Sequence, residues 1–132
     1  MTFLELCQRL RAECQDLGSG PETVAGQNGR NLRYVEAIRE SWVKLQTSRA
    51  DWDWLTSDTP TPLQMLADDS DTPFIDEAYH VVIVWNALRK MAITELAQEL
   101  IVRGEDEFAT WHGILCKKYI SQSLSFCAGE SL

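Results

Sequence analysis

The chain has 132 residues, of which 45% are hydrophobic and 24% are charged. This length corresponds to one domain, which buries roughly two thirds of the surface that its unfolded chain exposes. The hydrophobic fraction is too high for a disordered protein, and the sequence contains no run of about 18 apolar residues that would span a membrane. We therefore expect a single globular domain over residues 1–132 and no membrane partner.

The formal net charge of −8 argues against a protein that binds nucleic acid through its phosphate backbone. A surface that DNA must slide past without sticking would also be acidic, because like charges repel. Solubility alone is the other interpretation of this charge, and composition by itself favours it.

The N-terminal segment lacks the basic start and apolar block of a signal peptide, so we expect the protein to stay in the compartment where it is made. The four cysteines, at positions 7, 14, 116 and 127, are expected to be free thiols, since cytosolic thiols are kept reduced. A zinc site of Cys116, Cys127 and His112 is disfavoured, because their spacing matches no known pattern and no Cys-x-x-Cys pair is present.

The first predicted helix covers about residues 2–17. Thr2 and Glu5 have the spacing of a capping box, and apolar residues recur at helical spacing behind them. Gly18 is expected in the left-handed conformation just past the helix end. The glycines of the connection over 18–29 do not form a known nucleotide-binding pattern, so a phosphate loop there is disfavoured.

A second amphipathic helix is predicted over about residues 31–48. After it come Trp52 and Trp54, each next to aspartates. Two residues at this spacing cannot share a helix face, but they share one side of an extended segment. We expect them to seal one end of the helical core. The alternative, an aromatic platform for stacking bases, is disfavoured because the aspartates would repel a phosphate backbone.

Residues 56–74 are predicted to form a loop or linker, with one helical turn around Leu63–Leu66. This segment contains three of the four prolines and several aspartates. The aspartates do not follow the order of an EF-hand calcium loop.

A central helix is predicted over about residues 75–91. Pro73 and the acidic Asp76 and Glu77 place its start at Ile75 or Asp76. From position 78 to 88 only His80 and Asn86 are clearly polar, so this helix lacks the wet face of a surface helix. Protein must cover it on all sides, either from the same chain or from another copy.

The region over about 93–120 is predicted to be helical, either as one helix weakened at Gly104 or as two consecutive helices. A flexible tail is expected over about 121–132, whose spaced apolar residues could instead dock on a neighbour. The predicted fold is an all-α bundle of four to five helices with a mostly buried central helix.

Nothing in the sequence forms a recognisable catalytic set. His80 and His112 both lie in helical stretches, where a hydrogen-bonded structural role is more common than that of a general base. The Glu-x-x-His pattern of di-iron bundles is absent. We expect a protein that is not an enzyme, with no catalytic residues, no cofactor and no metal.

Two sets of residues carry a family resemblance. The first comprises Phe3-Leu4-Glu5-Leu6, Arg9-Leu10, Gly18-Ser19-Gly20-Pro21, Thr23-Val24, Gly26-Gln27, Trp42 and Asp51-Trp52-Asp53-Trp54-Leu55. The second comprises Leu66-Ala67-Asp68-Asp69-Ser70-Asp71-Thr72-Pro73, His80, Ile83-Val84-Trp85 and Ala87-Leu88. In this order they resemble the head-to-tail adaptors of tailed bacteriophages. Where that family has a β-rich stretch, this chain has only residues 56–65, as a compact natural variant or because the stretch has been removed.

The resemblance implies a structural connector in the neck of a virion, assembled in the host cytoplasm. It implies a homo-oligomeric ring that contacts the portal protein and the tail or neck proteins, with DNA passing through its channel without sequence-specific binding. A ring requires one patch of each copy to meet a different patch on the next. The alternative function is a small acidic protein that inhibits a nucleic-acid enzyme by mimicking phosphate charge, which predicts carboxylates clustered on one face.

Overall fold

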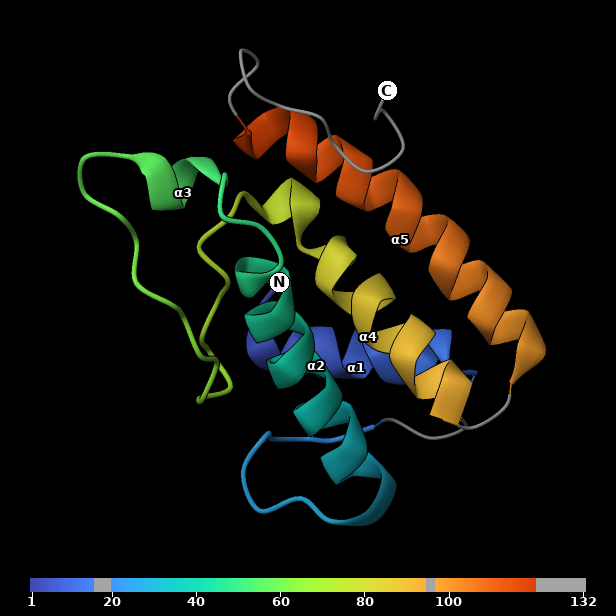
Figure 1. Cartoon of the computed structure of the whole chain (residues 1–132). Helices are drawn as coiled ribbons and strands as arrows, with labels where there is room; N and C mark the ends of the chain where they lie inside the picture. Colours follow the sequence, from blue (N-terminus) through green and yellow to red (C-terminus); the bar gives the residue numbers. More distant parts are fainter. Residues whose placement is uncertain (16–19, 95–96, 121–132) are drawn as a thin grey trace.

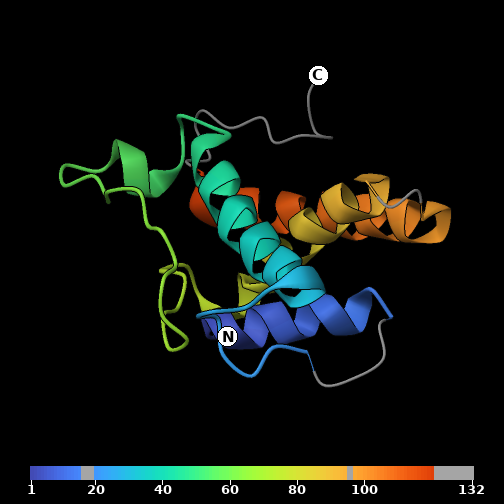
Figure 2. The same cartoon turned by 90° about the horizontal axis from the view of Figure 1, so that it is seen from below.

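The computed structural model describes residues 1–15, 20–94 and 97–120, and in this part of the chain the protein is all-α. Five α-helices and one 3-10 helix follow each other along the sequence: α1 Phe3–Glu13, α2 Gly29–Thr47, α3 Asp53–Thr56, η1 Glu77–Tyr79, α4 Val81–Thr94 and α5 Gln98–Tyr119. Helices α1, α2 and α5 all pack against α4, which lies in the middle of the bundle (Figures 1 and 2). The predicted all-α bundle of four to five helices is confirmed.

Helix α1 begins as predicted and ends earlier than predicted. Thr2 and Glu5 form both bonds of the capping box, and the buried face comprises Phe3, Leu6, Cys7 and Leu10. The helix ends at Glu13 because Gln15 adopts a φ of 62°, which a right-handed helix cannot continue. The predicted end at Leu17 is therefore wrong, and Gly18, expected in the left-handed position, lies outside the described residues.

Helix α2 starts two residues before the predicted range, at Gly29, whose φ of 57° suits a residue without a side chain. Its apolar stripe includes Val35, Ile38, Trp42 and Leu45, all buried against the rest of the bundle. The stripe at helical spacing thus predicted the buried face of this helix.

The central helix α4 starts later than predicted. Asp76 has an extended ψ of 141°, η1 follows it, and the α-helix begins only at Val81. The ring Nε2 of His80 lies 2.8 Å from the carbonyl oxygen of Ile75, so at the start of the turn this backbone oxygen bonds to a side chain. Every residue from Val82 to Leu88 is buried by the same chain. The same chain therefore supplies the cover that the apolar sequence of this helix predicted.

Helices α4 and α5 form an antiparallel hairpin along one side of the molecule (Figure 1). Helix α4 extends to Thr94, and α5 continues without interruption through Gly104. A Cβ atom at position 104 would lie 3.0 Å from both Cα and N of Arg89. Gly104 is thus a contact point where the two helices approach closely, and the expected weak point there is wrong.

The segment over 57–76 has no regular helix or strand and projects from the helical body beside α3 (Figures 1 and 2). The predicted helical turn at Leu63–Leu66 is wrong, and the short helix in this region is α3, which contains Trp54. Gln64 fixes the segment to α2: its Oε1 accepts hydrogen bonds from Trp42 Nε1 at 2.9 Å and from the Phe74 amide at 3.1 Å. Its backbone exchanges two further bonds with the Gln46 side chain.

Candidate functional site

The two histidines both make structural contacts. His80 is buried, and in addition to its bond with Ile75 its Nδ1 lies 2.7 Å from the amino group of Met1. A neutral ring protonated at Nε2 satisfies both contacts, and burial lowers the pKa of His80 below its ordinary value. These contacts give His80 a structural role.

His112 packs on aromatic rings. Its ring stacks on Phe108 with centroids 5.1 Å apart and meets the edge of Trp52 at 6.1 Å. Burial, with the nearby Arg49 and Arg89, lowers the pKa of His112. Cys116 Sγ is 3.9 Å from the ring, and Cys127 lies outside the described residues. Among the described residues there is no group of three or more potential metal ligands.

The two tryptophans of the Asp51–Leu55 segment belong to the core. The Trp52 and Trp54 rings stack on each other with centroids 4.7 Å apart, and their exposed fractions are 0% and 8%. Trp54 also contacts Trp42, Phe74 and Tyr119. Since these ring faces are covered by the chain itself, they are not available for stacking bases, and the expectation that they seal the core is confirmed.

The aspartates of the 56–74 segment hold the loop together. The carboxylate of Asp69 accepts hydrogen bonds from Thr23 Oγ1 and, at 2.6 Å, from the Val24 amide. Asp71 accepts from the amides of Ala67 and Asp68, which lowers its pKa. The acidic approach to α4 therefore joins the 20–28 connection to the loop.

The described cysteines are buried thiols. Cys7, Cys14 and Cys116 are not in disulfides, and burial raises the pKa of Cys7 to about 12. A thiol with so high a pKa is a poor nucleophile at neutral pH.

One exposed apolar area lies on the projecting segment, and we call it the loop surface. It consists of Leu63, Met65 and Phe74, with exposed fractions of 50%, 62% and 37%. Beside it is a depression of about 360 Å³ whose walls include Trp54, Leu55 and Leu63. Contiguous exposed apolar side chains are typical of interaction sites.

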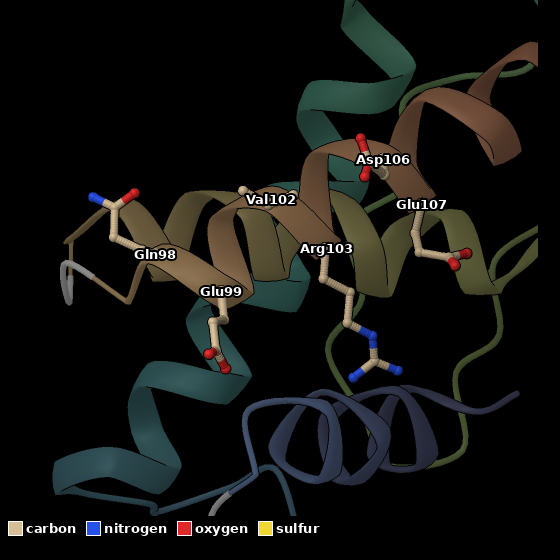
Figure 3. Close-up of a pocket in the computed structure, with 6 residues that line it drawn as sticks. All are labelled: Gln98, Glu99, Val102, Arg103, Asp106 and Glu107. Atoms are coloured by element: carbon tan, nitrogen blue, oxygen red, sulfur yellow. The ribbon is translucent and has the colours of Figure 1, made fainter.

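A second area, the helix surface, lies on α5 around Val102, which is 59% exposed and is surrounded by polar and charged side chains. A shallow depression of about 540 Å³ is lined by Gln98, Glu99, Val102, Arg103, Asp106 and Glu107 (Figure 3). Arg103 extends from this surface toward α1, where it forms an ion pair of 2.7 Å with Glu13. In Figure 1 this first half of α5 and the projecting loop lie on opposite sides of the molecule.

Sequence reasoning did not identify either surface. Leu63 and Met65 were assigned to a linker, and Val102 lay in a stretch predicted only as helix. The sequence signal that could have indicated these surfaces is the presence of large apolar side chains outside the predicted apolar stripes of the helices. No helix among the described residues is long and apolar enough to cross a membrane. Comparisons of the chain with protein-family models, with curated proteins and with solved structures found no match.

Proposed function

We propose that this protein is a structural subunit of the head-to-tail connector of a tailed bacteriophage, and that copies of it form a ring between the portal and the tail. The observation that carries the proposal is the pair of exposed surfaces, each with at least one large exposed apolar side chain, on opposite sides of the chain. Such a pair supports an interface in which one patch meets a different patch on the next copy, as ring closure requires. In this arrangement the loop surface of one copy packs on the helix surface of its neighbour.

The ordered motifs described above and the acidic charge support the remainder of the proposal. A net charge of −8 would repel DNA from the wall of a channel. The protein would be located at the neck of the virion, between the portal protein and the tail or neck proteins.

Phosphate mimicry is the less favoured function. It requires carboxylates gathered on one face, whereas the described acidic residues occur on α1, α2, α3, α5 and the long connections. Several already have local partners: Glu13 pairs with Arg9 and Arg103, Asp51 pairs with Arg49, and Asp69 bonds to the Val24 amide.

The test is the assembly state of the purified protein, measured by light scattering and electron microscopy, alone and with a portal ring. Met65→Asp and Val102→Asp should each prevent ring formation, because each places a charge in the proposed interface. Leu32→Asp is the matched control, since Leu32 is 37% exposed on α2, outside both surfaces. It should assemble like the original protein.

A mixture of Met65→Asp and Val102→Asp separates the ring geometry from other associations. Each variant retains one intact surface, so one copy of each should join through the remaining pair of intact surfaces and form dimers but no larger assembly. A protein that stays monomeric at high concentration and does not associate with a portal ring would refute the proposed function.

A further inference from the structure

A cleft between α2, α4 and α5 concentrates positive charge in this acidic protein. It has a volume of about 340 Å³ and lies apart from the loop and helix surfaces. Its lining residues are Lys44, Leu45, Ser48, Asn86, Arg89, Lys90, Phe108 and His112. Three of these eight side chains carry a full positive charge, whereas none is acidic.

The two lysines of this cleft lie beside each other although they come from different helices. Partial burial lowers the pKa of Lys90, and repulsion from the adjacent Lys44 and from Arg89 lowers it further. Among the described residues that shift the pKa of Lys90, the carboxylate of Glu40 raises it. Like charges held together destabilise the fold unless an anion lies between them.

The cationic side chains around the cleft differ in whether they already have a partner. Arg89 Nη1 lies 3.5 Å from Glu105 Oε1, and Arg49 Nε lies 2.8 Å from Asp51 Oδ1. Within the described part of the chain, neither Lys44 nor Lys90 forms an ion pair with a carboxylate. The C-terminal dipole of α2 stabilises Lys44, which lies in the last turn, but it does not explain why Lys90 lies beside it.

The floor of the cleft includes apolar and aromatic side chains. Leu45 is buried, Phe108 stacks on His112, and the Arg89 guanidinium lies 4.1 Å from the centre of the Phe108 ring. The buried Asn86 fixes Arg89, because its Oδ1 accepts a hydrogen bond of 3.0 Å from Arg89 Nε. Asn86 is itself held by a 3.0 Å bond from its Nδ2 to Ser41 Oγ on α2. These contacts therefore hold the Arg89 guanidinium in place beside the Phe108 ring.

We propose that this cleft binds a small phosphate monoester, with the phosphate between Lys44 and Lys90 and an apolar or aromatic body against Leu45 and Phe108. A phosphate monoester carries a charge of about −1.5 to −2 at pH 7, which matches two ammonium groups better than a single carboxylate does. The volume is at the lower end of the range for small-molecule sites, about 300 to 1,000 Å³.

The arrangement favours a small ligand over a nucleic-acid backbone. A protein that follows a phosphate backbone needs a stripe of lysine and arginine along its surface, and its affinity falls steeply with salt. Here the unpaired lysines are confined to one cleft on a chain whose net charge is −8. The inference is independent of ring formation, since neither proposed subunit surface contributes to the cleft.

The experiment measures binding of inorganic phosphate and phenyl phosphate to the full chain by calorimetry at constant ionic strength, with chloride as the reference anion. Saturable binding is expected, with phenyl phosphate tighter than inorganic phosphate because its ring contacts the floor. The double variant K44M/K90M should weaken binding by about tenfold or more. The matched control K117M/K118M removes the same charge from the exposed end of α5 and should change the affinity by less than about twofold.

A DNA duplex of about 20 base pairs forms the third arm of the experiment. The inference is overturned if the protein shows no saturable phosphate binding, if both double variants lose the same affinity, or if K44M/K90M retains the original affinity. It is also overturned if the duplex binds more tightly than phenyl phosphate and loses that binding in K44M/K90M. Circular dichroism of each variant ensures that the comparison is made on folded protein. Assembly of the ring is measured on the same samples, so a failure of this inference is distinguishable from a failure of the proposed function.

Discussion

Replacing Gly104 by alanine tests the close approach of α4 and α5. The new Cβ would lie 3.0 Å from the Cα and N atoms of Arg89, and these backbone atoms cannot rotate away as the end of a side chain would. Gly113 provides the control on the same helix, because a Cβ at that position meets nothing within 4 Å. The two substitutions thus differ in what the added methyl group contacts.

The expected magnitudes follow from two opposing effects. Alanine is favoured over glycine inside a helix by about 1 kcal/mol, so Gly113→Ala should stabilise the protein by about 0.5 to 1 kcal/mol. At Gly104 the same gain is opposed by overpacking, which costs about 1 to 3 kcal/mol because carbon atoms prefer a separation of about 3.5 to 4.0 Å. Gly104→Ala should therefore be neutral or destabilising, and less stable than Gly113→Ala by about 1 to 3 kcal/mol.

The measurement is urea denaturation of both variants and the original protein at one protein concentration, because assembly makes the apparent stability depend on concentration. Equal stabilisation by the two substitutions would refute the reasoning, since it would mean that α4 and α5 are not in close contact at Gly104. A lower stability of Gly113→Ala would show that helix propensity is not the dominant effect at the open position.

Three further changes test the core, the loop and the pH response. Trp85 is 4% exposed, and Trp85→Ala should lower the free energy of unfolding by about 3 to 5 kcal/mol. The loss should lie toward the lower end because the buried Nε1 has no hydrogen-bond partner among the described residues. Trp85→Phe should lower it far less, and equal losses would contradict this account. Gln64→Ala should cost about 1 to 3 kcal/mol and speed proteolysis within 57–76, because it leaves the indole N–H of Trp42 unpaired; an unchanged cleavage rate would argue against this anchor. The fold lowers the pKa of His80 and of His112, so the unfolded chain binds more protons than the folded one at acidic pH. The stability that these groups contribute should be complete above their ordinary pKa of about 6.5 and fall as the pH drops below it, and the double variant H80Q/H112Q should flatten this slope.

Local patterns predicted the helices well where the determining contacts are local. The capping box of Thr2 and Glu5 and the apolar stripe of α2 involve residues within a few turns of each other. The prediction was wrong where distant contacts accompany the backbone change. At the start of α4, His80 Nδ1 contacts the amino group of Met1, which is far away in the sequence, beside a 3-10 turn that the acidic residues and Pro73 did not indicate.

The sequence predicted a linker over about 56–74 with one helical turn, but it did not predict how this segment is held. Gln64 joins it to Trp42 and Gln46, which are far away in the sequence. The hydrophobic periodicity of a sequence does not indicate which glutamine will make such bonds. The sequence likewise placed Lys44 and Lys90 on separate helices, and only the packing of those helices brings the two amines together.

The sequence by itself determined that the fold is helical and that the stretch around Trp85 must be covered by protein, because apolar side chains on every side of a helix cannot face water. Only the tertiary structure decided that α1, α2 and α5 of the same chain supply this cover. It also decided that Gly104 is a contact rather than a break, and that Val102 and Met65 are among the large apolar side chains that stay exposed. The physical reason is that burial depends on which helices meet and how closely, and a sequence pattern specifies a helix face but not its partner.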